Sequence, residues 1–177
     1  MLRLLLLRHV KSDWSETGAG DHDRPLAARG AKAAPRMGRA MARRGWRPAA
    51  CLTSTARRAR DTARLVLDEV PESGAIPVTP VGELYDFGSG REVAAAIARH
   101  GGAASPLLVV GHNPALHALA QRLAGKGRKG DMAELKRKFP TGALAVIDLD
   151  IASWADLPGA SGRLAAFLRP KALNDNG

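Results

Sequence analysis

Short apolar runs alternate along the chain with longer stretches that have helical spacing. Residues 2–7 and 107–110 are continuous apolar runs, which are typical of strands covered on both faces. Residues 49–53 and 142–149 predict two more strands, and residues 76–79 predict a weaker one between prolines. The apolar pattern therefore predicts a sheet whose central strands are buried.

Helices are predicted between these strands. They cover residues 28–44, 57–70, 91–100 and about 114–123, and most end at glycine or proline. Pro35 lies inside the first of these stretches and predicts a late start or a kink. Residues 162–168 alternate with arginine and predict an edge strand.

Alternation of strands and helices predicts a three-layer α/β/α sandwich with a mostly parallel central sheet. No long helix separates the last two strands, which predicts an antiparallel edge. No repeat or linker divides the chain, so residues 1–177 are expected to form a single domain.

The chain has one cysteine, Cys51, which excludes an internal disulfide framework and a multi-cysteine metal site. Its apolar neighbours favour a buried packing residue. The lack of a disulfide framework favours a protein of a reducing compartment. The apolar run at residues 4–7 is too short for a signal core, and no stretch is long enough to cross a bilayer. We therefore expect a cytoplasmic protein without a membrane partner.

The net charge of +10 favours anionic partners. Aromatic residues make up only 4% of the chain, too few for a base-stacking platform, so the charge indicates an anion and does not favour nucleic acid. The lysine-rich stretch at residues 126–138 is interpreted as a solvated, mobile surface, with docking of a partner as the alternative.

Candidate chemistry lies where the predicted strands end. Ligand sites in open α/β sheets gather beyond the carboxyl ends of the strands. The first strand ends at Arg8 and His9, the second at Ser54, and the fourth at His112. An imidazole can attack phosphorus, and arginine stabilises phosphoryl oxygens, so this edge predicts phosphoryl transfer without a metal or cofactor. Neighbouring cations such as Arg58 would keep His9 neutral.

Three segments carry a resemblance to a known family. They are LLRHVKSDW at residues 6–14, STARRARDT at 54–62 and VGHNP at 110–114. Together they resemble the signature motifs of the histidine phosphatase, or phosphoglycerate mutase-like, superfamily. The KSDW continuation, ELY at 83–85 and FPTGALA at 139–145 resemble the SixA-like phosphohistidine phosphatases in particular. The short connections leave little room for the lid insertion of the mutases.

The resemblance implies a role for each matching residue. His9 would be the nucleophile that becomes phosphorylated, and Glu83 would donate a proton to the leaving group. Serine-to-arginine spacing favours Arg58 over Arg57 as the motif arginine. The residues implied in binding phosphate or bordering the pocket are Arg8, Arg58, His112, Lys11, Ser12 and Trp14.

Other interpretations stay open for several residues. The segment around His112 could be a turn whose Asn113 caps the next helix, and Glu83 could equally be a solvated loop residue. His22, His100 and His117 receive no role. The acidic residues Asp13, Asp21 and Asp23 hint at metal binding but lack a calcium-loop pattern, and they are interpreted as solvent-exposed.

The resemblance thus favours a phosphatase that removes phosphate from phosphohistidine on a protein. A phosphatase of a small phosphorylated metabolite or nucleotide is the alternative within enzymes. A non-catalytic module that binds phosphate or nucleic acid is the alternative of another class. The sequence leaves the oligomeric state open.

Overall fold

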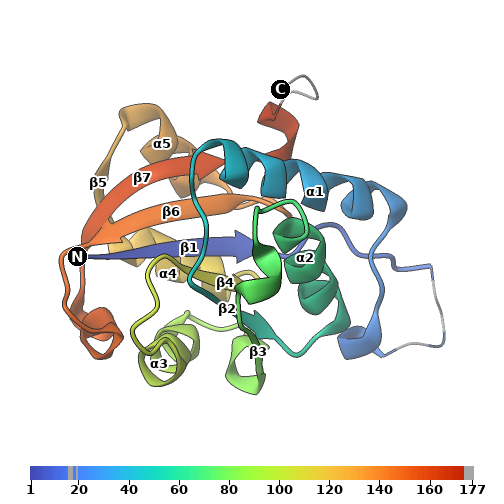
Figure 1. Cartoon of the computed structure of the whole chain (residues 1–177), viewed down its shortest axis with the longest axis horizontal. Helices are drawn as coiled ribbons and strands as arrows, with labels where there is room; N and C mark the ends of the chain where they lie inside the picture. The colour runs from blue at the N-terminus through green and yellow to red at the C-terminus, as the bar shows by residue number, and fades with distance from the viewer. Residues whose placement is uncertain (16–17, 19, 174–177) are drawn as a thin grey trace.

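The computed structural model describes residues 1–15, 18 and 20–173 and contains one seven-stranded sheet between two layers of helices (Figure 1). The strands are β1 (Leu2–Arg8), β2 (Ala50–Ser54), β3 (Val78–Val81), β4 (Leu107–Gly111), β5 (Ala124–Gly127), β6 (Leu144–Leu149) and β7 (Gly162–Leu168). The α-helices are α1 (Ala28–Arg43), α2 (Arg57–Leu67), α3 (Arg91–His100), α4 (Ala115–Leu123) and α5 (Lys129–Arg137). Short 3-10 turns include η1 (Asp21–Asp23), η3 (Gly82–Leu84) and η4 (Trp154–Gly159).

The strand order is β3-β2-β4-β1-β6-β7-β5, which confirms the three-layer, mostly parallel α/β fold. β6 runs antiparallel to both of its neighbours, β1 and β7. The outermost strand on that side is β5, which pairs in parallel with β7. The prediction that residues 162–168 form the edge was therefore wrong, because the four-residue strand β5 was not predicted.

Side chains of β1 alternate between two cores. Leu4 and Leu6 pack with α3 and α4, whereas Leu5 and Leu7 pack with α1 and α2. All four are fully buried, as the continuous apolar run predicted. Cys51 is also buried, and burial raises the pKa of its thiol to about 12, which fits a packing role.

One expectation about helices is corrected. α1 runs from Ala28 to Arg43 with Pro35 inside it, so the helix does not start late. The basic stretch at residues 126–138 forms part of β5 and α5. Leu135 is buried in the core, and the lysines are exposed, as expected of a solvated surface. Of the helices that the structure describes, none combines the length and apolar character that a membrane crossing needs.

The close approach of α1 and α2 generates a prediction about stability. A Cβ added at Gly38 would lie 2.2 Å from the Val66 carbonyl oxygen, so Gly38→Ala should destabilise the fold by about 1–3 kcal/mol. Gly130 in α5 has nothing within 4 Å of an added Cβ. Gly130→Ala should therefore be neutral or stabilising by up to about 1 kcal/mol. Urea denaturation of both variants measures the change in the free energy of unfolding, and equal changes in the two variants would contradict the prediction.

Candidate active site

Three strand ends meet at one edge of the sheet and bring two histidines together. β1 and β4 pair so that Arg8 lies opposite Gly111, and the backbone N–H of His9 donates to the Gly111 carbonyl at 3.1 Å. His9 and His112 therefore leave neighbouring strands side by side, with ring centroids 5.1 Å apart. This pairing confirms that the two histidines share one edge.

The ring of His9 is held in one tautomer. Its Nδ1 lies 2.7 Å from the carbonyl oxygen of Val10, which can only accept, so Nδ1 carries the proton and Nε2 keeps its lone pair. Burial, together with the charges of Arg58, Arg8 and Arg24, lowers the pKa of His9 to about 3. His9 is therefore neutral near pH 7, as a nucleophile must be.

His112 is fixed through both ring nitrogens. Its Nδ1 lies 3.3 Å from Nη2 of Arg58 and accepts, because a guanidinium has no acceptor. Nε2 then carries the proton and donates to Oγ of Ser54 at 2.8 Å. Burial lowers the pKa of His112 to about 3, with His9 and Arg58 contributing. Ser54 therefore orients His112 from the end of β2.

Arg58, which is buried, and Arg8, which is half-buried, supply positive charge to the site. Arg58 is the second residue of α2, and its side chain is only 2% exposed. Nη1 of Arg8 donates to the Phe139 carbonyl at 3.0 Å. Among the described residues, the buried Nε atoms of both arginines have no hydrogen-bond partner. Each guanidinium thus retains a donor that the protein itself does not satisfy.

The loop after β1 reaches this site through Arg24, which sequence reasoning missed. Nη1 of Arg24 donates to Oγ of Ser12 at 2.8 Å, and its guanidinium carbon lies 3.5 Å from the ring centroid of Trp14. Lys11 takes part through its backbone, whose carbonyl accepts from the N–H of Ala27. The structure therefore places Ser12 and Trp14 near the pocket and adds a third arginine to it.

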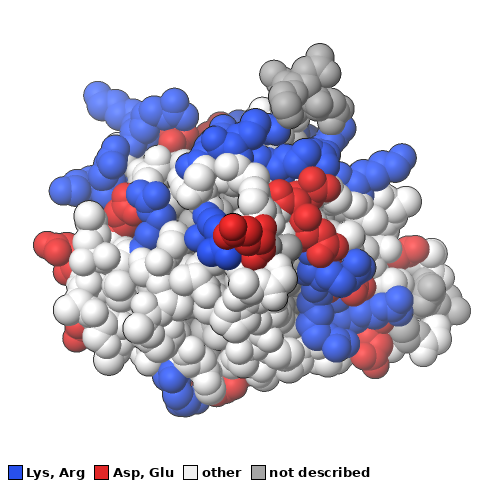
Figure 2. Space-filling view, viewed as in Figure 1, with Lys and Arg blue, Asp and Glu red and all other residues white. Residues whose placement is uncertain are grey.

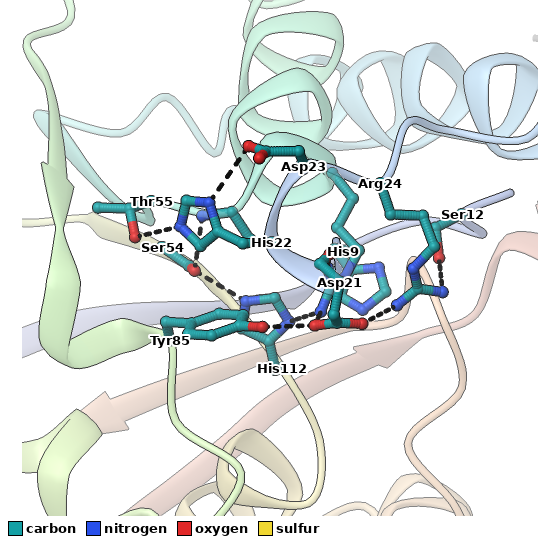
Figure 3. A network of polar contacts seen from close by, with 12 residues as sticks. His9, Ser12, Asp21, His22, Asp23, Arg24, Ser54, Thr55, Tyr85 and His112 are labelled. Atoms are coloured by element: carbon teal, nitrogen blue, oxygen red, sulfur yellow. Dashed lines mark hydrogen bonds and ion pairs between the residues drawn. The ribbon is translucent and has the colours of Figure 1, made fainter. Parts of the chain in front are cut away.

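Asp21 is a carboxylate of the site. Its side chain is 44% exposed, as expected, but its carboxylate also contacts residues of the site, which the sequence did not predict. Oδ1 accepts from Arg24 at 2.7 Å, and Oδ2 accepts from Arg58 at 3.1 Å and from the Tyr85 hydroxyl at 2.5 Å (Figure 3). The hydrogen bond from Tyr85, then the charge of Arg58, lowers the pKa of Asp21 to about 2. No simple pattern in the sequence distinguishes Asp21 from Asp13 and Asp23.

Those two acids behave as expected. Oδ1 of Asp13 accepts from the hydroxyl and backbone N–H of Ser15, and Asp23 is 74% exposed. In the part of the chain that the structure describes, no group of three or more His, Cys, Asp or Glu side chains could hold a metal ion. A reaction without a metal remains a prediction.

Glu83 is not brought together with these residues. Its Oε1 lies 2.6 Å from Nη1 of Arg99 and 3.4 Å from Nε2 of His100, both on α3. Its own backbone N–H and the His100 ring lower the pKa of this exposed carboxyl, which stabilises the anion. In this arrangement Glu83 is part of a surface ion pair, and the carboxylate at the site is Asp21.

Aromatic rings surround His112 on the open side. Tyr85 and Phe87 lie 5.3 Å and 5.0 Å from it, and their rings are 5.0 Å apart. Phe87 is 47% exposed, so its ring reaches solvent. His22, which had no predicted role, packs 5.1 Å from Tyr85, and its Nε2 lies 2.9 Å from the Thr55 hydroxyl. His117 instead contacts the Leu135 carbonyl, away from the site.

The low pKa values of His9 and His112 generate a prediction about stability and pH. Both values lie below the ordinary value of about 6.5, so the unfolded chain binds more protons than the folded one as pH falls towards 3. The free energy of unfolding should therefore fall over this window, by up to about 1.4 kcal/mol per pH unit for each histidine. Urea denaturation at several pH values measures the slope.

The matched variant is His9→Gln, which keeps a polar side chain but does not titrate in this range. Its slope of unfolding free energy against pH should be shallower than that of the unchanged protein. Equal slopes would contradict the assignment of a depressed pKa to His9.

Comparisons with known proteins agree with this geometry. A family model described as "Histidine phosphatase superfamily (branch 1)" matches residues 4–91. An uncharacterized protein of Mycobacterium tuberculosis is 37% identical over 179 residues, covering 93% of this chain and 100% of that protein.

Two solved structures share the whole fold. One is a protein of Agrobacterium tumefaciens provisionally assigned as the phosphohistidine phosphatase SixA, with TM-score 0.76, 30% identity and coverage of 96% of this chain and 99% of that one. The other, with the same provisional assignment, is from Nakamurella multipartitia, with TM-score 0.77, 32% identity and 97% of each chain covered. With its paired histidines and buried arginines, the chain belongs to the histidine phosphatase superfamily, in its SixA-like branch.

Proposed function

We propose that this phosphatase removes phosphate from phosphohistidine on a protein, through a phosphorylated His9. The observation that carries the proposal is the tautomer of His9. With the proton on Nδ1 held by the Val10 carbonyl, the Nε2 lone pair is available at a neutral ring next to Arg58 and His112. Phosphoryl transfer depends mainly on such positioning and on positive charge around the oxygens.

In the first step, Nε2 of His9 forms a bond to phosphorus as the P–N bond of the substrate breaks. The electron pair of that bond stays on the leaving imidazole, which takes up a proton. Arg8 and Arg58 are the proposed ligands of the phosphoryl oxygens, since each has an Nε–H without a partner among the described residues. Ser54 holds His112 beside them.

In the second step, water attacks phosphorus and the bond to Nε2 of His9 breaks. The products are inorganic phosphate and a neutral His9, and the water proton leaves with phosphate or to solvent. The Val10 carbonyl stabilises the Nδ1 proton throughout both steps. No cofactor is needed for this balance of bonds and protons.

The position of Glu83 supports a phosphoramidate substrate. An alkoxide leaving group depends on a general acid, whereas a leaving imidazole nitrogen accepts a proton readily. Glu83 is held by Arg99 and His100 as an anion, and Asp21 is an anion as well. A site without a protonated carboxyl near His9 is poorly equipped to cleave alkyl esters.

A positively charged surface with exposed aromatic rings supports a protein substrate. β4 and α4 are joined only by His112, Asn113 and Pro114, so no covering segment is inserted at this connection. Phe87 and Trp14 are 47% and 71% exposed, so flat rings are available to pack against an imidazole. Lysine and arginine dominate the charged surface in the view of Figure 2, which suits an anionic partner.

Covalent labelling tests the nucleophile. With a 32P-labelled phosphohistidine protein, a rapid quench should trap acid-labile label on the unchanged protein. His9→Ala should carry no label and should lose activity by a factor of about 10³ or more. His117→Ala is the matched control, because His117 contacts the Leu135 carbonyl away from the site, and it should be labelled normally. Full activity in His9→Ala would end the proposal.

Comparison of substrates tests the leaving group. The kcat/KM for a phosphohistidine protein should exceed that for alkyl phosphate esters, including a panel of metabolites and nucleotides, by about 10²-fold or more, the usual contribution of a general acid. Glu83→Gln should leave both values nearly unchanged, because Glu83 does not contact the site. Preference for an alkyl ester would favour the metabolite phosphatase instead.

A further inference from the structure

The guanidinium of Arg58 is engaged by the protein's own Asp21. Nη1 of Arg58 donates to the backbone carbonyl of Asp21 at 2.6 Å, and Nη2 donates to its Oδ2 at 3.1 Å. Arg24 and Tyr85 donate to the same carboxylate. Three donors from different parts of the chain thus converge on one anion beside His112 (Figure 3).

A carboxylate and a phosphoryl group seek the same donors. Arginine binds both through its planar fork, and each Nη of Arg58 is already used by Asp21. A phosphoryl group that takes Nη2 of Arg58, in addition to the Nε–H that has no partner among the described residues, must therefore displace the Asp21 carboxylate. Two anions on one guanidinium would also repel each other.

Asp21 can be displaced without disturbing the core. It lies in the short turn η1, in which no residue is buried, and its side chain is 44% exposed. The pKa of Asp21 is about 2, so its carboxylate stays charged and competes over the whole physiological pH range.

We propose that Asp21 is a specificity-determining residue, an internal competitor that only an anion binding more tightly than a carboxylate displaces from Arg58 and Arg24. This inference rests on the proposed function, because the exclusion of carboxylates matters only for a protein substrate. The surface of a protein substrate carries many Asp and Glu side chains, and a pocket with three arginines would otherwise bind them. A tethered carboxylate at high effective concentration excludes these monoanions, whereas a phosphoryl dianion competes through its greater charge.

Calorimetric titration with inorganic phosphate tests this without turnover. If the conformer with Asp21 withdrawn is a minor state of about 10% or less, removing the competitor should tighten phosphate binding by about tenfold or more. Asp21→Asn keeps the shape and removes the charge, and Asp21→Ala is the second variant if the first is poorly folded by circular dichroism. Both should bind phosphate more tightly than the unchanged protein.

Asp23→Asn is the matched control, because it removes the same charge from the same turn at an exposed side chain. Its phosphate affinity should stay close to that of the unchanged protein. Acetate, which carries the same group as Asp21, should become a measurable competitor of phosphate in Asp21→Asn.

Equal or weaker phosphate binding by both Asp21 variants would overturn the inference, since Asp21 would then only hold Arg58 in place. Acetate without effect on Asp21→Asn would also overturn it. Neither outcome touches the labelling of His9, so the proposed function would stand. Conversely, tighter binding by the Asp21 variants together with an unlabelled His9 would support the competitor and overturn the proposed function.

Discussion

The pairing of β1 with β4 is the constraint on which the site depends. Arg8 lies opposite Gly111, so His9 and His112 leave adjacent strands at the same level. A slip of one residue would turn every side chain of β1 to the other face. Such a slip would carry Arg3 or Arg8, which flank the four buried leucines, into a buried position, so the burial of Leu4 to Leu7 fixes the register. The burial of four leucines thus positions His9, the proposed nucleophile.

Positive charges from three arginines and the negative charge of Asp21 lie close together at this edge of the sheet. Three arginines surround two histidines, and their positive potential together with burial keeps both rings neutral. The same potential would attract any anion. Asp21 is the one carboxylate that contacts both Arg24 and Arg58 among the described residues, and it compensates part of their charge. The arginines thus help to keep both histidines neutral and also attract anions, and in the inference above Asp21 limits that attraction.

In the proposed function, the leaving group is the point at which the site departs from a general phosphatase. Glu83 lies in η3 close in sequence to Tyr85, which does contact the site. Arg99 and His100 hold its carboxylate on the side of α3 instead. The neighbouring aromatic residues Tyr85 and Phe87 pack on His112. The segment after β3 thus contributes aromatic rings to the site but holds Glu83 away from it. This arrangement suits the proposed substrate, whose leaving nitrogen takes up a proton without a general acid.

Much of this arrangement could be predicted from the sequence because it depends on local pattern. The apolar run of β1 predicted burial on both faces, and strand–helix alternation predicted the parallel sheet. The rule that sites form beyond strand ends then selected His9, Ser54 and His112. The four-residue β5 and the α5 helix were missed because they are short and charged, and they are ordered by the contact of Leu135 with the core.

Only the tertiary structure decided which loop residues take part. Asp13, Asp21 and Asp23 are equivalent as a pattern, and the direction of their side chains depends on what the fold places opposite them. Asp21 meets Arg58 from α2, which is 37 residues away, while Asp23 faces solvent. Glu83 likewise pairs with Arg99 and His100 because the fold places α3 opposite it. The sequence by itself determined the strands of the sheet other than β5 and the two histidines, because these follow from local periodicity and strand ends. The motif arginine, Arg58, followed from the resemblance of its segment to the family. The partners of each charge were decided by long-range packing, which periodicity does not encode.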